Sequence, residues 1–254
     1  MTRDTGKNSL SPTGVKALAF DVFGTVVDWR ESIATEAATV AARHGISGNW
    51  HDFADAWRAG YAPAMQRVRV GDLPWSNIDQ LHRLILDSLL ERFKLGGLGE
   101  AERADLTHAW HRLTPWDDSV AGLGLLKKRF TITTLSNGSF ALLTNLAKHG
   151  GLPWDCIVSA ELFNHYKPDP ETYLGTARLL DIAPSQLMLV AAHPDDLRAA
   201  RRQGLKTAFV RRLDEFGAGR YPYRVGDDEF DVTATDFIDL ARQLNFNSRV
   251  SPDK

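Results

Sequence analysis

The segment Val15–Asp28, VKALAFDVFGTVVD, constrains the fold more than any other part of this sequence. A short apolar run ends at Asp21, and a Gly24–Thr25 turn follows. Such a run beside a glycine is typical of a strand buried on both faces, as in a parallel sheet. In open parallel sheets, ligands bind beyond the carboxyl ends of the strands. The segment therefore predicts that Asp21 faces such a crevice, although an aspartate there can also simply cap the turn.

Later segments alternate between strand and helix patterns, which predicts an α/β fold with a doubly wound parallel sheet. Further strands are expected at Phe130–Leu135, at Ile157 and Val158, at Leu187–Ala191 and at Thr207–Val210. Helices are expected at Val120–Lys128, Phe140–His149, Pro170–Leu180 and Leu197–Gln203, with a last one carrying Phe237, Leu240, Ala241 and Leu244.

Residues 29–115 interrupt this alternation with helical patterns alone. Apolar residues recur at helical spacing from Ile33 to Ala41, and Gly45 ends that run. The other expected helices carry Phe53, Ala54, Trp57 and Arg58; Leu81, Leu84, Ile85 and Leu89 on one face of Ile78–Phe93; and, after Gly96, Gly97 and Gly99, a stretch to Leu113. Pro115 then marks a return to the sheet, since proline seldom continues a helix.

Charge, cysteine content and the termini exclude several classes of protein. The net charge of −2 implies no bulk attraction to nucleic acid or to an anionic membrane. A single cysteine, Cys156, rules out an internal disulfide and a multi-cysteine metal site, and it fits a reduced, cytoplasmic setting. Residues 1–13 lack the apolar core of a signal peptide and are predicted to be a disordered leader; no run is long enough to span a bilayer.

Three more strand ends carry polar groups. LSNGS places Ser136 and Asn137 before a helix, where hydroxyl, amide and backbone N–H groups can bind an anion or merely cap the helix. HYKPDPETY places Lys167 in a proline-bounded loop, where its ammonium can neutralise a carboxylate. LVAAHPDDL places His193 and Asp196 after the strand that ends at Ala191.

The order of these four motifs resembles the haloacid dehalogenase superfamily. FDVFGT, the AWR ending at Arg58, LSNGS and YKPD are similar to the signatures of its type II (L-2-haloacid) dehalogenases. The resemblance implies a Rossmann-like core with an inserted α-helical cap. We therefore expect a core of residues 14–28 and 116–245, a cap of residues 29–115, and a tail of residues 246–254.

Phe23 separates the reactions known in this superfamily. Its phosphatases carry a second aspartate two residues after the nucleophile, which protonates the departing alcohol. Phe23 cannot do this, whereas a halide is a weak base that leaves without a proton. Ala192 also stands where those phosphatases have a magnesium ligand. We therefore expect no metal and no cofactor.

The resemblance implies a role for each matched residue. Asp21 would be the nucleophile, Thr25 would hold its carboxylate and Lys167 would pair with it. Arg58, assisted by Asn137, would accept the halide beside Phe23. The remaining matches are Ser136, which would hold the substrate carboxylate, Tyr173, which would support the site, and Asp196, which would activate water.

Two departures from the family pattern concern the last motif. Where the family commonly has Ser-Ser-Asn-x-Trp-Asp, this chain has AAHPDD, so His193 replaces an asparagine and Asp195 a tryptophan. A histidine there can orient or activate water near neutral pH, or serve only as hydrogen-bonded structure. Without the tryptophan, fluoroacetate, chloroacetate and longer 2-haloacids all stay open as substrates.

The function expected from these features is hydrolysis of a 2-haloacid to a 2-hydroxy acid, without a cofactor. The alternatives are a Mg²⁺-dependent phosphatase of the same superfamily and a non-catalytic relative that binds a ligand, because fold alone never implies activity. The resemblance also allows a homodimer formed through cap helices. Whether His193 or Asp196 is the main base stays open at this point.

Overall fold

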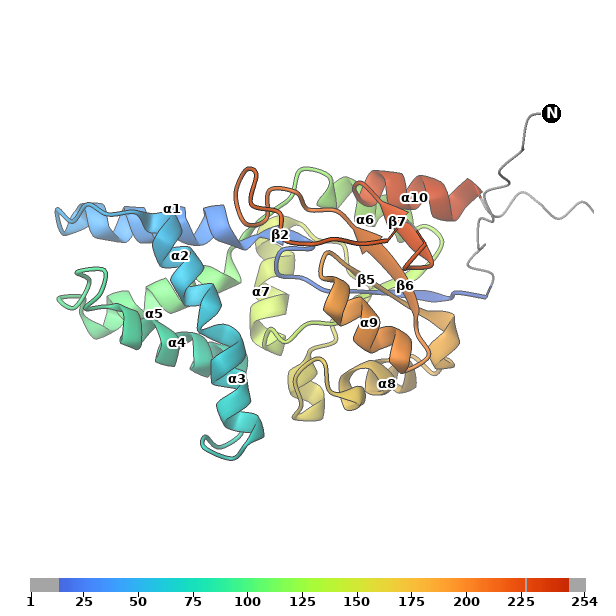
Figure 1. The fold of residues 1–254 in the computed structure, drawn as a ribbon, viewed down its shortest axis with the longest axis horizontal. Helices are drawn as coiled ribbons and strands as arrows, with labels where there is room; N and C mark the ends of the chain where they lie inside the picture. Colours follow the sequence, from blue (N-terminus) through green and yellow to red (C-terminus); the bar gives the residue numbers. More distant parts are fainter. Residues whose placement is uncertain (1–13, 227, 247–254) are drawn as a thin grey trace, which may run out of the picture.

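The computed structural model describes residues 14–226 and 228–246, and these form an α/β core with a helical region at one end (Figure 1). The sheet has five parallel strands in the order β4-β1-β5-β6-β7. They are β1 (Ala17–Phe20), β4 (Thr131–Thr134), β5 (Leu187–Ala191), β6 (Lys206–Val210) and β7 (Val232–Ala234). The predicted fold class is confirmed, while the leader 1–13 and all but the first residue of the tail lie outside the described residues.

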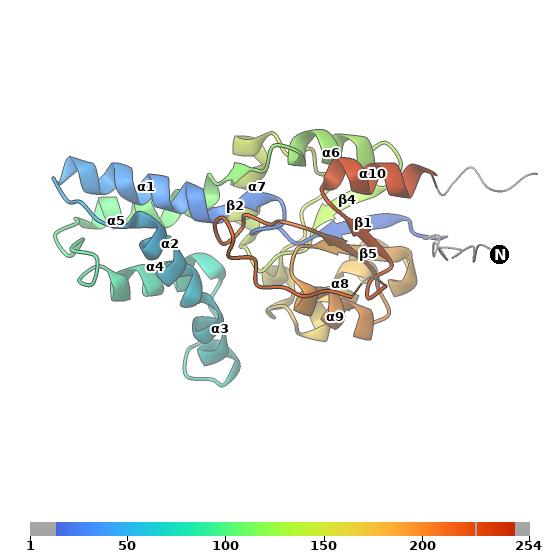
Figure 2. The ribbon, with the colours of Figure 1, turned by 45° about the horizontal axis from the view of Figure 1, so that its top comes forward.

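Helices cover both faces of the sheet, which explains why its strands are almost continuously apolar. One face packs on α6 (Ser119–Leu126), α7 (Phe140–Gly150) and α10 (Phe237–Phe246), and the other on α8 (Pro170–Leu179) and α9 (Pro194–Arg202). Successive residues of β1 belong to different cores, since Leu18 and Phe20 face the first set of helices and Ala17 and Ala19 the second. Figure 2 shows the two helical layers.

The helical region consists of α1 (Trp29–Arg43), α2 (Trp50–Ala59), α3 (Tyr61–Arg69), α4 (Ile78–Leu89) and α5 (Glu100–Thr107), followed by the 3₁₀ helix η1 (His108–His111). The two chain segments that join it to the core pair as a short antiparallel ribbon, β2 (Val27–Asp28) with β3 (Thr114–Pro115). The boundaries proposed from the sequence for the cap fall at this ribbon.

Several local expectations were wrong. Helix α3 and strand β7 were not foreseen, α4 ends at Leu89 instead of Phe93, α9 begins at Pro194 instead of Leu197, and β3 lies inside the block expected to be helical. Leu84, expected on the buried face of α4, is 38 % exposed. Proline at a first helical position has a suitable φ and lacks only an N–H that would be unpaired there, which explains the early start of α9.

The expected strand at Ile157 and Val158 does not form. This segment makes only isolated bridges beside β4, at Thr133 with Cys156 and at Ser136 with Ser159. Side chains take the place of some ladder bonds, because the Ile132 N–H donates to the Asp155 carboxylate (2.9 Å) and the Val158 N–H donates to the Thr134 hydroxyl (3.0 Å). Backbone bonds supply others, such as that from the Asp155 N–H to the Ile132 carbonyl (3.0 Å). The edge of the sheet is therefore satisfied without a sixth strand. The segment also contains the short 3₁₀ helix η2 (Ala160–Phe163), and η3 (Pro184–Gln186) precedes β5.

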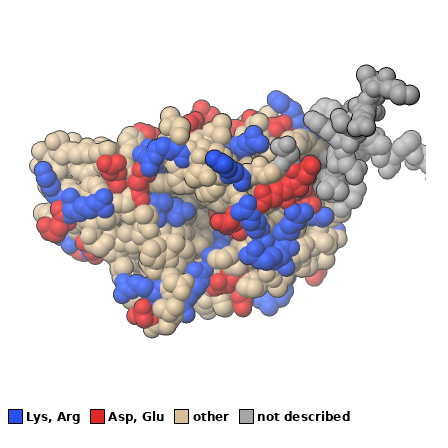
Figure 3. All heavy atoms as spheres, in the orientation of Figure 1, with Lys and Arg blue, Asp and Glu red and all other residues tan. Residues whose placement is uncertain are grey.

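The surface shows no single dominant sign of charge on the face in Figure 3, where acidic and basic side chains lie beside one another. This agrees with the net charge of −2. Within the described ranges, no helix combines the length and apolar character needed to cross a membrane.

Candidate active site

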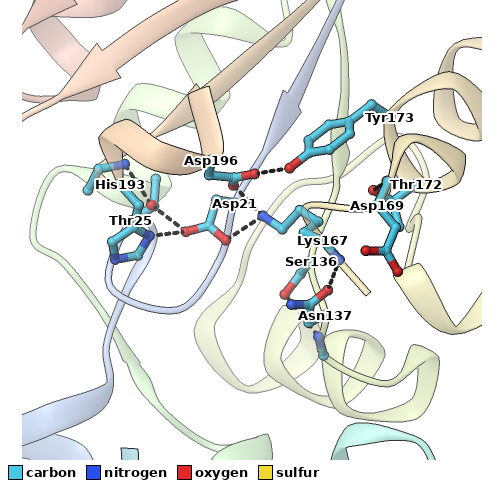
Figure 4. Close-up of polar contacts among 12 residues, drawn as sticks. Asp21, Thr25, Ser136, Asn137, Lys167, Asp169, Thr172, Tyr173, His193 and Asp196 are labelled. Carbon is cyan, nitrogen blue, oxygen red and sulfur yellow. Dashed lines mark hydrogen bonds and ion pairs between the residues drawn. The ribbon is translucent and has the colours of Figure 1, made fainter. Parts of the chain in front are cut away.

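Asp21 follows the last residue of β1 and is only 7 % exposed. Three side chains donate hydrogen bonds to its carboxylate: the Thr25 hydroxyl to Oδ2 (2.7 Å), the Lys167 ammonium to Oδ1 (2.8 Å) and His193 Nδ1 to Oδ2 (3.0 Å) (Figure 4). Burial alone would raise the pKa of Asp21, but Lys167 and His193 outweigh it and hold that pKa well below its usual range. The carboxylate is therefore ionised and fixed in orientation.

The register of the sheet explains why these groups meet. Phe20 pairs with Thr134 of β4 on one side and with Val190 of β5 on the other, so the residues after all three strands come to one edge. Thr25 joins two of these ends, because its hydroxyl donates to Asp21 and accepts the Ala192 N–H (2.9 Å). The turn from Asp21 to Thr25 requires glycine at position 24, because the backbone φ there is +79°.

Lys167 lies between two carboxylates. Its ammonium is 2.8 Å from Asp21 Oδ1 and 2.5 Å from Asp196 Oδ2, and the residue is 9 % exposed. The other oxygen of Asp196 accepts a hydrogen bond from the Tyr173 hydroxyl at 2.6 Å. Burial alone would lower the pKa of Lys167, but Asp196 and Asp21 outweigh it and raise that pKa above its ordinary value. Both oxygens of Asp196 are thus occupied in holding Lys167 and Tyr173.

His193, the N-cap residue of α9, lies between Asp21 and a second acid, Glu215. Its Nδ1 is 3.0 Å from Asp21 Oδ2, and its Nε2 is 2.9 Å from Glu215 Oε1. Burial alone would lower the pKa of His193, but Glu215 and Asp21 outweigh it and raise it to about 10. The ring is therefore an imidazolium at neutral pH, with one proton directed to each carboxylate.

A cavity of about 190 Å³ opens beside Asp21. All of the site residues predicted from the sequence line it except Thr25 and Tyr173. The hydroxyls of these two residues donate hydrogen bonds to Asp21 and Asp196, respectively. The lining residues are Asp21, Phe23, Arg58, Tyr61, Ser136, Asn137, Lys167, Pro168, His193, Asp195 and Asp196. A small organic acid is the size of ligand that such a cavity can hold.

The cap supplies a cation and an aromatic wall to this cavity. Arg58, on α2, places its guanidinium 4.6 Å from the ring centre of Tyr61, at the start of α3. Its Nε is buried and has no hydrogen-bond partner in the described part of the chain. Phe23 packs against Tyr61 and Trp110 at centroid distances of 6.4 Å and 5.6 Å. The position two residues after Asp21, where an acid was expected in a phosphatase, is thus an apolar wall here.

Ser136 and Asn137 form the opposite side. The Ser136 hydroxyl accepts the Gly138 N–H (3.1 Å), which leaves its own proton free to donate, and Asn137 Oδ1 accepts the Lys167 N–H (2.7 Å). Asn137 therefore ties the loop after β4 to the loop that carries Lys167, as Figure 4 shows. The Asn137 side-chain amide also points to Met65 Sδ, at 3.4 Å.

Sequence reasoning missed Tyr61 and Glu215. Tyr61 lies on α3, a helix too short to show a periodic pattern, and Glu215 lies in a loop with no recognisable motif. The only signal for Glu215 was its place after β6, whose carboxyl end belongs to the same edge of the sheet.

Two other findings concern the choice of site. A larger cleft of about 630 Å³ lies at the junction of cap and core, lined by residues that include Asp28, Arg112 and Arg212, away from Asp21. Within residues 14–226 and 228–246, no three or more His, Cys, Asp or Glu residues are grouped so as to hold a metal. We place the site at Asp21 because the ionised groups converge there.

Comparison with known proteins identifies the class and then the family. A family model for haloacid dehalogenase-like hydrolases matches residues 15–204, so the chain belongs to that superfamily of hydrolases. It is 30 % identical to (S)-2-haloacid dehalogenase 1 of Pseudomonas sp. (strain CBS-3), over 79 % of this chain and 86 % of that protein.

Two solved structures are more similar still. One, of an L-2-haloacid dehalogenase, has a TM-score of 0.85 and 47 % identity, over 91 % of this chain and 100 % of that one. The other, of a defluorinating L-2-haloacid dehalogenase, has a TM-score of 0.87 and 44 % identity, over 91 % and 95 %. Within the superfamily, the chain is a member of the L-2-haloacid dehalogenase family.

Proposed function

We propose that this protein hydrolyses short 2-haloalkanoic acids to 2-hydroxy acids through an ester on Asp21. The observation that carries the proposal is the ionised Asp21 carboxylate, fixed by Thr25, Lys167 and His193 and facing a small cavity. The similarity to L-2-haloacid dehalogenases, two of them above 40 % identity, supports the same reaction.

In the first half-reaction, a carboxylate oxygen of Asp21 attacks carbon 2 of the substrate. The new C–O bond forms as the carbon–halogen bond breaks, and the halide leaves with the bonding electron pair. Arg58 is the cation on the cap side of the cavity, so we assign it to the departing halide. The Ser136 hydroxyl proton is available to hold the substrate carboxylate.

In the second half-reaction, water attacks the carbonyl carbon of the Asp21 ester and releases the hydroxy acid. The base must lie within hydrogen-bond reach of that water. Both oxygens of Asp196 already bind Lys167 and Tyr173, whereas His193 Nδ1 contacts the Asp21 carboxylate itself. We therefore assign the base to His193, and we assign to Asp196 the task of holding Lys167.

The phosphatase alternative lacks support at two positions. Phe23 is 4 % exposed and packs among aromatic rings, so it offers no acid for an alcohol leaving group. The Lys167 ammonium lies between Asp21 and Asp196, the carboxylates from which a metal would have to be held. Both positions favour a halide as the leaving group.

Single-turnover hydrolysis in ¹⁸O water tests the proposal. With protein in excess over 2-chloropropionate, the label should enter the Asp21 carboxylate, because water attacks the aspartyl carbonyl and not carbon 2. Mass spectrometry of the peptide containing Asp21 measures the label, and the peptide containing Asp195 in the same digest is the control.

Label confined to the hydroxy-acid product would mean that water attacks carbon 2 directly, and the assignment of Asp21 would be wrong. In a separate assay, halide release from fluoroacetate, chloroacetate and each enantiomer of 2-chloropropionate defines the substrate range. Failure to release halide from any of them would reject the proposed reaction itself.

A further inference from the structure

Glu215 is a buried acid that the two half-reactions leave without a task. It lies in the loop after β6 and is 1 % exposed. Its Oε1 accepts hydrogen bonds from His193 Nε2 (2.9 Å) and from Trp29 Nε1 (3.1 Å). Its Oε2 is buried and has no hydrogen-bond partner among the described residues. A buried carboxylate is costly unless it is paired, so its pairing with His193 needs an explanation.

The nucleophile turn is shaped around this carboxylate. A Cβ atom on Gly24 would lie 2.1 Å from Glu215 Oε1, so only glycine fits at this position of the turn. The Glu215 carboxylate therefore lies against the loop that carries Asp21. It contacts Nε2 of the His193 ring, whereas Asp21 contacts Nδ1. Together Glu215, His193 and Asp21 form one chain of hydrogen bonds across three strand ends, those of β6, β5 and β1.

We infer that Glu215 is a positioning residue for ester hydrolysis: it keeps a proton on His193 Nε2, so that Nδ1 becomes the base that faces the Asp21 ester. The inference rests on the proposed function, since it needs an ester on Asp21. A histidine has two nitrogens, and the hydrogen bond made by one decides which of them is free to act.

Among the protein groups around His193, only Asp21 changes its charge when the ester forms. The groups that face the ring are Asp21 and Glu215, which hold its nitrogens, and Tyr223, whose ring centre is 6.1 Å away. Lys167 and Arg58 line the same cavity. When Asp21 becomes an ester it loses its negative charge, so Nδ1 no longer has an anionic partner, while Glu215 still holds Nε2.

Each proton can be accounted for over the two half-reactions. Asp21 displaces halide, and the imidazolium releases its Nδ1 proton to solvent once Asp21 is neutral. Nδ1 next takes a proton from water as the hydroxide oxygen bonds to the aspartyl carbonyl carbon. As that adduct collapses, the bond to the alkoxide oxygen breaks and the adduct's hydroxyl proton passes to that oxygen, which leaves the Asp21 carboxylate, the imidazolium and the hydroxy acid. The sum is haloacid plus water to hydroxy acid, halide and one proton.

The variant Glu215→Gln tests this inference, because it keeps the shape of the side chain and removes its charge. Rapid-quench experiments with 2-chloropropionate measure the halide burst and the decay of the ester separately. We expect a burst of about one equivalent, as in the unchanged protein, followed by ester decay at least about tenfold slower. The exposed residue Glu171 offers the matched control Glu171→Gln, which should leave both phases unchanged.

The pH dependence of ester decay separates positioning from a merely structural role. In the unchanged protein, decay should rise with pH as His193 loses its Nδ1 proton. Without the Glu215 charge, the pKa of this limb should fall by about one unit or more, and the plateau should be lower because the base is weaker. A uniform slowing with an unshifted limb would overturn the inference.

A second measurement needs no variant. Nitrogen NMR of histidine-labelled protein should show both His193 nitrogens protonated at about pH 8, where an ordinary histidine is neutral. A ring that carries a proton on Nδ1 but none on Nε2 would overturn the inference as well. If the unchanged protein releases no halide, the proposed function fails; if it does and the Glu215→Gln limb is unshifted, only the role of Glu215 fails.

Discussion

Replacing Lys167 by methionine removes the only cation that lies between Asp21 and Asp196 in the described structure. The ammonium is 2.8 Å from one carboxylate and 2.5 Å from the other, at a residue only 9 % exposed. Removing one partner of a buried ion pair leaves uncompensated charge and typically costs about 3–5 kcal/mol. We expect Lys167→Met to lower the free energy of unfolding by about that amount at neutral pH.

The loss should depend on pH in a defined direction. In the unchanged protein, burial raises the pKa of Asp21, but Lys167 and His193 outweigh it and lower that pKa, so its ionised form stabilises the fold at any pH above the unfolded value of about 3.9. Without Lys167 the pKa of Asp21 rises, and the carboxyl takes up a proton at mildly acid pH. The difference between the two proteins should therefore shrink on acidification.

Urea unfolding followed by circular dichroism, at about pH 7.5 and about pH 5, measures both effects. Lys128→Met, at an exposed lysine, is the control and should change the free energy of unfolding by less than about 0.5 kcal/mol. A loss below about 1 kcal/mol for Lys167→Met, or a difference that grows as the pH falls, would refute this account of the ion cluster.

Three further predictions concern the site. Arg58→Ala should slow the halide burst by about a hundredfold or more, because a cation is lost where halide develops charge; a normal burst would show that Arg58 is wrongly assigned. Dialysis against EDTA should leave haloacid hydrolysis within about twofold of its starting rate, since Lys167 already pairs with Asp21, and strict Mg²⁺ dependence would contradict this. Gly24→Ala should lower the free energy of unfolding by about 1–3 kcal/mol, because residue 24 has a φ of +79°. It should also slow decay of the ester, because the added Cβ would meet Glu215. Gly124→Ala, whose added Cβ has nothing within 4 Å, is the control and should have neither effect.

Local patterns in the sequence were enough to predict the strands that carry the site. Leu187–Ala191 was predicted with the bounds that the structure shows, and the strand before Asp21 lies where the apolar run indicated. In a parallel sheet, the residues after neighbouring strands must meet at one edge, so local pattern and strand order together place Asp21, Ser136 and His193 near one another.

Two features depended on tertiary structure: whether the segment around Val158 pairs with β4 as a strand, and whether a short segment such as Tyr61–Arg69 forms a helix. The segment around Val158 has the composition of a strand, but side chains of Asp155 and Thr134 satisfy the sheet edge in its place. Helix α3 spans only Tyr61–Arg69 and packs against α2 and α4. Helices this short draw most of their stability from such tertiary packing. A short segment carries too little periodic information to predict such an outcome.

The division of labour between His193 and Asp196 was also open until the partners of each group were known. The sequence placed both residues at the start of one helix, beside the end of β5, where either could reach water. Only the folded chain brings Lys167 and Tyr173 onto Asp196, and Glu215 onto His193, from segments that no local pattern links. Apolar periodicity specifies which residues are buried, whereas the partner of a buried charge depends on long-range packing, and that partner decides its protonation and its role.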